Sequence, residues 1–223
     1  MSYVSYNYTK ILVDYANKNH LISKSFLEEN IIYNYRYSKN NQKIIGLDDY
    51  IQIILEVLKH IKIDNLLINL VKQYKLSSHG YLGLLGYCSY DIKSAIDLMV
   101  KYAYLEWPIV KYTFSVLNEE YSIIEIHDTI PLINHDIKYF IYLKSLLTPV
   151  IALNDILGEN LITDISFVGE CPINEYKKYF NYLNISPNCE NNLIKVKRKL
   201  LNNIHSNYNE HTFNMMLNEI QKL

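Results

Sequence analysis

Apolar residues recur every three or four positions through the first third of the chain, which is the spacing of helices with one buried face. Ser25 and Glu28 form a capping-box pattern, and acidic residues stand at the start of the next two apolar stripes. The polar run at 38–42 indicates a surface loop. The pattern predicts helices beginning after Thr9, from Ser25 to about Tyr35, from Asp48 to Lys62 and from Asp64 to Tyr74.

A charge-poor run with three glycines marks the middle of the chain, within the stretch 78–105. Gly80, Gly83 and Gly86 are three positions apart, so in a helix they would line one side and let another backbone approach closely. In an irregular loop they would instead supply positive φ angles. Ser89 is the predicted N-cap of the next helix, with Asp91 in the first turn, where the helix dipole favours a negative charge.

After Pro108 the period changes from 3.6 to 2, which predicts a β-hairpin with one buried face. Its strands are Val110–Val116 and Tyr121–His127, joined by a turn at 118–120. A long helix then runs from Asp136 to Leu157, with Pro149 expected to bend it and Gly158 to end it. The remaining predicted elements are a strand at Leu161–Val168, a helix at Ile173–Phe180 with Pro172 as its first residue, a strand at Leu193–Lys197 and a helix at Glu210–Lys222.

This order of elements predicts an α+β fold, with N-terminal helices followed by a small, mostly antiparallel sheet and packed helices. The sequence has no internal repeat and no Gly/Ser-rich linker, so we expect one domain over residues 1–223. Within it, a helical part covers about 1–106, a sheet-containing part about 107–204, and a C-terminal connector helix about 209–223.

Charge and composition exclude several kinds of partner. The chain has 22 basic and 23 acidic residues, a net charge of −1, and no basic footprint for nucleic acid. Its only arginines are Arg36 and Arg198, which argues against bidentate anion clamps. Three cysteines without CxxC spacing (Cys88, Cys171 and Cys189), a polar N-terminus and no apolar run of ~20 residues favour a cytoplasmic protein with no membrane partner.

No catalytic, metal or cofactor motif is present, so we expect neither an enzyme nor a bound cofactor or metal. The glycine spacing matches neither a P-loop nor GxGxxG, and there is no GxSxG elbow. His205 and His211 are too far apart for one helical metal face. Glu125 and His127 share a strand face, which is expected to be solvated, and Cys88 is expected to be a buried, inert thiol.

Aromatic residues near the hairpin and on the following helix are the candidate ligand-binding residues. Such side chains could line a pocket for a small amphipathic molecule, or they could simply belong to the core, and the pattern alone leaves both interpretations open. The candidates are Trp107, Tyr112, Phe114, Tyr121, Tyr139 and Tyr142.

The order of these signals resembles a known family. After the N-terminal helices come the run containing Gly83 and Gly86, a capped helix with Ala95 inside, and an alternating hairpin. Then follows an F-x4-P-x3-Y-x3-F spacing, formed by Phe167, Pro172, Tyr176 and Phe180. From about Ile11 to Leu201 the chain is similar to the N-terminal effector ("arabinose-binding"-type) domain of AraC-family transcription regulators.

The resemblance implies a domain that senses a small-molecule effector of unknown identity and forms a homodimer. In that family DNA is bound only through a C-terminal part with two helix-turn-helix units. This part would begin beyond Leu223, so we expect that the sequence stops at a domain boundary of a longer regulator, although a naturally shortened protein is the alternative. A protein-interaction or oligomerisation module without a ligand is the competing functional interpretation.

Overall fold

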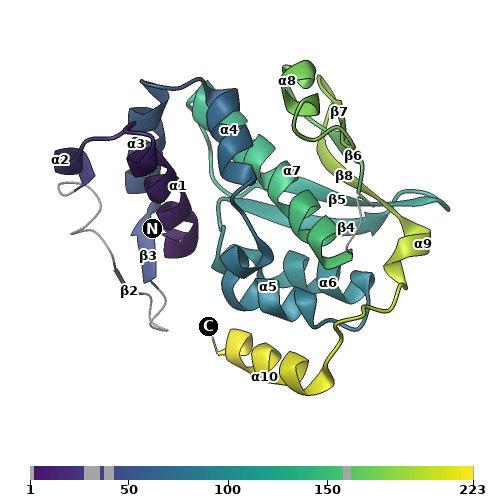
Figure 1. Ribbon diagram of the computed structural model, residues 1–223. Coiled ribbons are helices and arrows are strands. Elements are labelled where there is room, and N and C mark those ends of the chain that lie inside the picture. Colours follow the sequence, from purple (N-terminus) through teal and green to yellow (C-terminus); the bar gives the residue numbers. More distant parts are fainter. Residues whose placement is uncertain (1–2, 28–35, 38–42, 158–161, 223) are drawn as a thin grey trace.

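The protein has an α+β fold with a mostly antiparallel main sheet, as the sequence predicts (Figure 1). The computed structural model describes residues 3–27, 36–37, 43–157 and 162–222. One large cluster of buried apolar side chains extends from Val4 to Leu201 and so joins the helical part to the sheet-containing part. None of the helices in the described ranges has the length and apolar character that crossing a membrane requires.

The N-terminal part contains a small sheet that the sequence does not predict. Its strands β1 (Tyr3–Ser5), β3 (Lys43–Gly46) and β2 (Arg36–Tyr37) are antiparallel and lie in that order. Strands of two to four residues are too short to show a period of two, which is why the pattern missed them. Helices α1 (Tyr6–Lys18) and α3 (Leu47–Leu58) pack beside this sheet.

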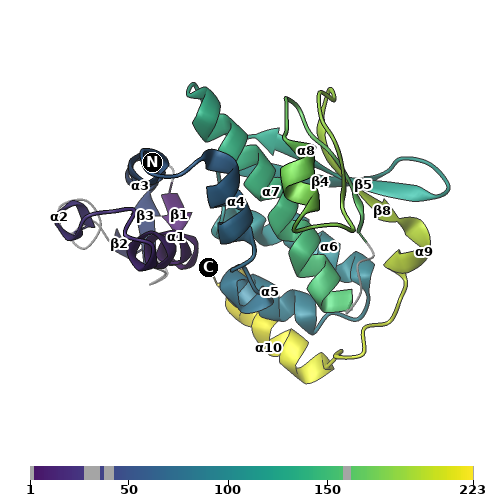
Figure 2. The same cartoon turned by 45° about the horizontal axis from the view of Figure 1, so that its top comes forward.

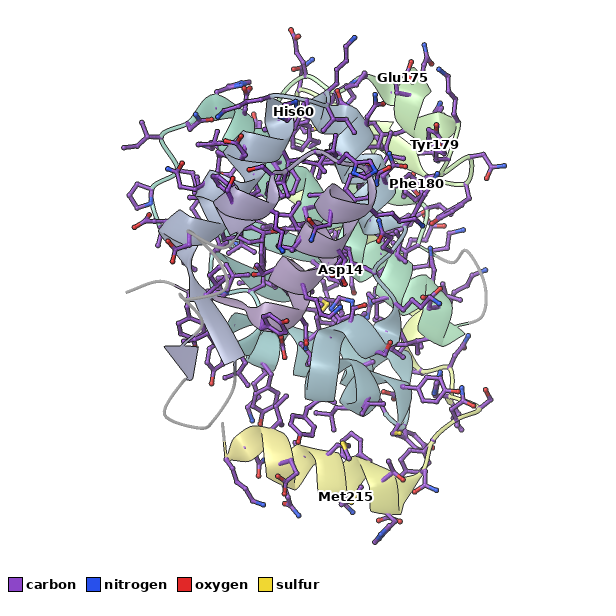
Figure 3. The ribbon with its side chains drawn as sticks, turned by 60° about the vertical axis from the view of Figure 1, so that its left-hand side comes forward. Asp14, His60, Glu175, Tyr179, Phe180 and Met215 are labelled. Carbon is purple, nitrogen blue, oxygen red and sulfur yellow. The ribbon has the colours of Figure 1, made fainter. Side chains whose placement is uncertain are left out.

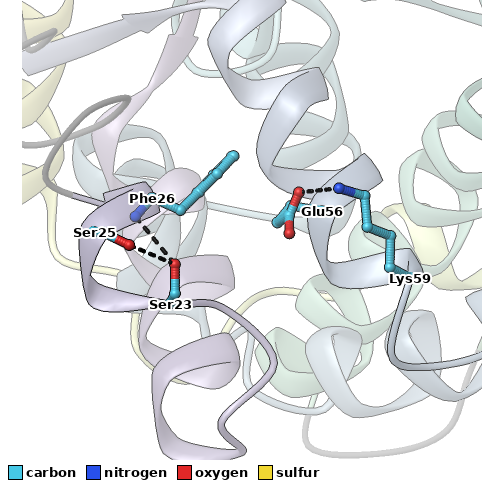
Figure 4. Close-up of polar contacts among 5 residues, drawn as sticks. All are labelled: Ser23, Ser25, Phe26, Glu56 and Lys59. Atoms are coloured by element: carbon cyan, nitrogen blue, oxygen red, sulfur yellow. Dashed lines mark hydrogen bonds and ion pairs between the residues drawn. The ribbon is translucent and has the colours of Figure 1, made fainter.

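The second helix begins earlier than predicted. Helix α2 spans Lys24–Leu27, and the Oγ of Ser23, rather than that of Ser25, accepts a hydrogen bond of 3.1 Å from the backbone N–H of Phe26 (Figure 4). Ser23 and Ser25 share a further hydrogen bond of 3.1 Å. The predicted end of this helix at Tyr35, the Glu28 of the capping box and the polar run at 38–42 lie outside the described residues.

The glycine run forms two short helices. Helix α4 (Ile63–Val71) leads into a 3₁₀ turn, η2 (Leu76–His79), and then into α5 (Gly80–Tyr87). Helix α6 (Ile92–Tyr102) follows and ends in the 3₁₀ turn η3 (Ala103–Leu105).

The predicted N-cap of α6 was wrong. Asp91 is the cap, because its carboxylate accepts a hydrogen bond of 2.8 Å from the N–H of Ser94. Ser89 is buried and donates its hydroxyl to the carbonyl of Leu85 in the last turn of α5, at 2.8 Å. The hydroxyl therefore serves the end of one helix rather than the start of the next.

The main sheet has the strand order β4-β5-β8-β6-β7. The predicted hairpin is formed by β4 (Val110–Val116) and β5 (Tyr121–Asp128), and β5 pairs with β8 (Asn192–Lys197). Strand β6 (Asp164–Ser166) is shorter than the predicted Leu161–Val168, and Leu161 lies outside the described residues. Strand β7 (Asn184–Ser186) was not predicted, and it forms the one parallel pairing of this sheet, with β6.

Helix α7 (His135–Leu157) is the central element of the fold. It contacts β5 and β8 of the sheet and also α3, α4 and α5, so it lies between the sheet and the N-terminal helices (Figures 1 and 2). All residues from 140 to 150 are buried, as expected of a helix that is covered on every side. The helix continues through Pro149, while Gly158 lies outside the described residues.

Three helices of the described residues lie in the C-terminal part of the chain, after β6. Helix α8 (Ile173–Lys177) follows Pro172, and α9 (Arg198–Leu201) directly follows β8. Helix α10 (Glu210–Gln221) lies against α5, with Met215 exposed on it (Figure 3). It docks through a small separate cluster of apolar residues, made by Leu85, Tyr102, Leu105 and Ile220 together with Leu82, Leu98, Phe213, Met216 and Leu217.

Candidate ligand-binding site

A cavity of about 70 Å³ lies between α7 and the helices of the N-terminal half. Its walls come from α1, η2, α5, α6, η3, β4 and α7, so it lies where the two parts of the fold meet. The residues that line it are Tyr8, Leu76, His79, Leu82, Gly83, Gly86, Ala95, Met99, Ala103, Trp107, Tyr112, Lys144, Ser145, Thr148, Pro149, Ala152, Leu153 and Ile156.

The glycine run shapes one wall of this cavity. A Cβ added to Gly83 would lie 1.9 Å from the backbone oxygen of Leu76, so the close backbone approach predicted for the glycines is confirmed at this position. Gly80 has a φ of +53°, the positive angle that the alternative interpretation expected. At Gly86 an added Cβ would meet only the Cδ1 of Ile156, at 3.3 Å.

Pro149, in the opposite wall, leaves one backbone carbonyl of α7 without its helical hydrogen bond. A proline has no N–H, so the carbonyl of Ser145, four residues earlier in α7, lacks its helical donor. The hydroxyl of Tyr112 in β4 donates to that carbonyl at 3.1 Å, and the indole Nε1–H of Trp107 donates to the Oγ of Ser145 at 2.9 Å. Both aromatic residues are therefore held against α7 by polar contacts as well as by packing.

A buried lysine lines the cavity. Lys144 is only 2% exposed, and its Nζ is 3.3 Å from the ring centre of Trp107, 4.2 Å from that of Tyr8 and 5.0 Å from that of Tyr74. Such ring faces attract a cation. Burial nevertheless penalises the charged amine and lowers the pKa of Lys144 well below its usual value.

His79 and Tyr8 form the neighbouring part of the wall. They share a hydrogen bond of 2.7 Å between the tyrosine hydroxyl and the His79 Nδ1. Burial, with a smaller contribution from Lys144, lowers the pKa of His79 to about 4, so this imidazole is neutral at pH 7. The pKa of Tyr8 is raised well above its usual value, first by burial and then by Glu106.

Thr148 adds an unused hydroxyl to the cavity. It lies one helical turn after Lys144 on α7, is 6% exposed, and its Oγ1 has no hydrogen-bond partner among the described residues. A buried hydroxyl without a partner costs free energy, so its presence in a cavity wall indicates a group that a bound molecule can satisfy.

The structure brings together only some of the six aromatic candidates. Trp107 and Tyr112 line the cavity and are also buried core residues. Phe114 and Tyr121 are partly buried on the sheet and do not line it. Tyr139 and Tyr142 line a separate, more open depression near the start of α7, where their hydroxyls donate to the carboxylates of Asp64 and Asp128, each at 2.5 Å.

The sequence analysis missed Lys144, Tyr8, His79 and Thr148. Lys144 carried a readable signal, because it is the only charged residue between 139 and 154 in a helix that is otherwise apolar or uncharged there. The other three carried none, because their proximity depends on contacts between distant segments. The Tyr8–His79 pair, for example, is 71 positions apart.

The His, Cys, Asp and Glu side chains of the described residues are dispersed through the fold. No group of three or more of these described side chains is placed to hold a metal ion. The three cysteines are free, and Cys88 is buried, so that burial raises the pKa of its thiol. This agrees with the interpretation of Cys88 as an inert thiol.

The fold has a counterpart in a solved structure of a transcriptional regulator. One similar solved structure is the crystal structure of transcriptional regulator CdpR from Pseudomonas aeruginosa, with a TM-score of 0.69 and 11% sequence identity. The similarity covers 96% of this chain and 64% of the CdpR chain, and at this identity it shows the fold alone. No protein-family model and no curated protein sequence matches the chain.

Proposed function

We propose that this chain is the effector-sensing and dimerising domain of a bacterial transcription regulator of the AraC type. The fold shared with CdpR supports a regulator domain. The order of sequence signals around Gly83, Gly86 and Ala95 supports the AraC type. In this proposal a small molecule shifts the domain between two states because it binds one of them more tightly.

The observation that carries the sensing role is the cavity at the junction of the two parts of the fold. Its walls are mainly apolar, and a few buried polar groups face it, among them Lys144 and Thr148. That combination is characteristic of small-molecule sites. Because the walls come from both parts of the fold, a bound molecule would alter how those parts pack against each other.

Contact with DNA is assigned in this proposal to a part of the regulator outside these 223 residues. The net charge of −1 supports this assignment, because DNA-binding domains usually carry a basic surface. The greater length of the CdpR chain, of which this chain matches 64%, agrees with it.

A screen by thermal shift tests the sensing role. The chain would be heated with a collection of small metabolites, both neutral and charged, and compounds that raise its melting temperature would be retested on Ala152→Phe. Ala152 lines the cavity, so the larger side chain should fill it and remove the shift. Ile133→Phe is the matched control, because Ile133 is 97% exposed. Sensing at this site is contradicted if no compound shifts the wild type, or if every shift survives in Ala152→Phe.

An exposed apolar strip on α5 supports the proposed self-association. The outer face of α5 exposes Tyr81, Leu84 and Tyr87, at 43%, 44% and 39%, and an apolar strip of this kind is typical of contact sites. The same strip favours the second candidate function, an oligomerisation module that has no ligand. Light scattering over a range of concentrations should show a dimer that Leu84→Glu weakens. A strict monomer at every concentration excludes dimerisation through this domain.

A further inference from the structure

We propose that the cavity binds a small monocarboxylate with an apolar body, whose carboxylate is held by the Lys144 Nζ and the Thr148 hydroxyl. This inference rests on the proposed sensing function and specifies the chemical class of the effector.

Lys144 provides the first argument, because it is a buried amine with no anionic partner among the described residues. Among the residues that the structure describes, it forms neither an ion pair nor a hydrogen bond. Its contacts there are with the faces of the Trp107, Tyr8 and Tyr74 rings, which cannot neutralise its charge. Burial disfavours the charged form of this amine in the empty cavity. An incoming carboxylate favours the charged form again, because the ammonium and the carboxylate then form a charge-assisted hydrogen bond.

Thr148 and Lys144 together define where the head group would lie. They are four residues apart on α7, so both side chains lie on the same face of the helix and both line the cavity. The Thr148 Oγ1 has no partner there and can donate to the second oxygen of a carboxylate. The nearby His79 is neutral and is already hydrogen-bonded to Tyr8, so it adds no competing charge.

The rest of the cavity suits an apolar body. The lining residues that are partly exposed, and so lie nearest to solvent, are Leu76, Leu82, Met99 and Ala152. Lys144 and Thr148 are more deeply buried than these residues, which favours entry with the head group first. A volume of about 70 Å³ holds roughly five water-sized groups, so a carboxylate with a short chain fits and a bulky ligand does not.

The charge of the site distinguishes a monocarboxylate from other anions. Phosphate groups and dicarboxylates carry close to two negative charges and are usually bound by arginines. Here Lys144 is the only cationic side chain in the lining, and Arg198 bonds instead to the backbone carbonyl of Asn118 on the sheet. One amine and one hydroxyl that lacks a partner among the described residues match one carboxylate.

Calorimetry with a homologous series of probes tests the inference. Straight-chain carboxylates from acetate to octanoate would be compared with the primary alcohols of the same lengths, on the wild type, Lys144→Met and Thr148→Val. We expect at least one short carboxylate to bind about 10- to 100-fold more tightly than its matched alcohol, the size of one charge-assisted hydrogen bond. Lys144→Met should abolish that preference, and Thr148→Val should reduce it several-fold while leaving the melting temperature close to that of the wild type.

Lys101→Met is the matched control, because Lys101 is exposed on α6 and its Nζ also lies over a tyrosine ring, 4.9 Å from the centre of Tyr102. This variant should keep the full preference for carboxylates. Equal binding of carboxylates and alcohols by the wild type, or an unchanged preference in Lys144→Met, overturns the inference. If neutral compounds bind in the cavity and carboxylates do not, the sensing function stands and only the carboxylate assignment fails. If no compound of either kind binds there, both fail.

Discussion

Replacing Lys144 by methionine is expected to stabilise the folded chain at neutral pH, by on the order of 1–4 kcal/mol, the range seen when buried charged groups are replaced by apolar ones. The unfolded chain holds a proton on Lys144 below its usual pKa of 10.5, and the folded chain gives it up because burial lowers that pKa. The cost of burying Lys144 should therefore decrease as the pH rises toward 10.5, and the advantage of Lys144→Met over the wild type should shrink over the same range. Chemical denaturation at several pH values measures both effects. A destabilised Lys144→Met would show that the lysine has a structural role.

The hydrogen bond from Tyr112 to the carbonyl of Ser145 should be worth more in the presence of Pro149 than without it. Tyr112→Phe leaves that buried carbonyl without a donor and should cost about 1–3 kcal/mol of stability. In the Pro149→Ala background the N–H at position 149 can take over, so the same change should cost clearly less. A double-mutant cycle measured by denaturant unfolding gives the coupling. Equal costs in the two backgrounds would contradict this explanation of why Tyr112 reaches α7.

His79 should make the fold sensitive to acid. Its pKa falls from 6.5 to about 4 on folding, so between these values the unfolded chain binds a proton that the folded chain excludes. Stability is therefore expected to fall as the pH falls from 6.5 to 4, by about 3 kcal/mol in total from this group. The raised pKa of the nearby Glu106 acts in the opposite direction, so the informative quantity is the difference from His79→Gln, which should lack this contribution. Parallel curves for the two proteins would contradict the prediction.

At the scale of elements, the close packing of α5 against η2 depends on the absence of a side chain at Gly83. Gly83→Ala would place a methyl group 1.9 Å from the backbone oxygen of Leu76, so either η2 or α5 must move. We expect a loss of about 3 kcal/mol or more, at the upper end of the cost of overpacking. Gly86→Ala in the same helix is the control. Its methyl group meets only the flexible end of Ile156, and alanine favours a helix by about 1 kcal/mol over glycine, so its stability should stay within about 1 kcal/mol of the wild type. Similar melting temperatures for the two variants would show that the close approach is not tight.

Long elements were predictable, and very short ones were not. The hairpin, helix α7 and helix α10 were predicted to within one residue at each end. The hairpin and α10 repeat their pattern of apolar positions, whereas α7 is apolar on all sides in its middle and its length indicates a helix. The strands β1, β2 and β7 have two or three residues each, so no period could identify them. The cap of α6 was misplaced because Ser89 and Asp91 are both good caps, and only the contact of Ser89 with Leu85 decides between them.

At the scale of the whole molecule, the α+β class followed from the order of elements, whereas the site followed from contacts between distant segments. Trp107 and Tyr112 were predicted because aromatic residues near a sheet are common in pockets. The other four aromatic candidates do not line the cavity: Phe114 and Tyr121 lie elsewhere on the sheet, and Tyr139 and Tyr142 line a different depression near the start of α7. Lys144 stands out in the sequence as a lone charge in its helix, but its place in the site depends on the three rings from separate segments that lie around its amine.

Leu82 belongs to two compartments at once. Its side chain lines the cavity, and it also packs against the apolar cluster on which α10 rests. Among the described residues, only the Leu82 side chain is shared between the lining of the cavity and the apolar cluster that contacts α10. A change in the Leu82 side chain would consequently affect both the space available to an occupant and the packing of α10 on α5.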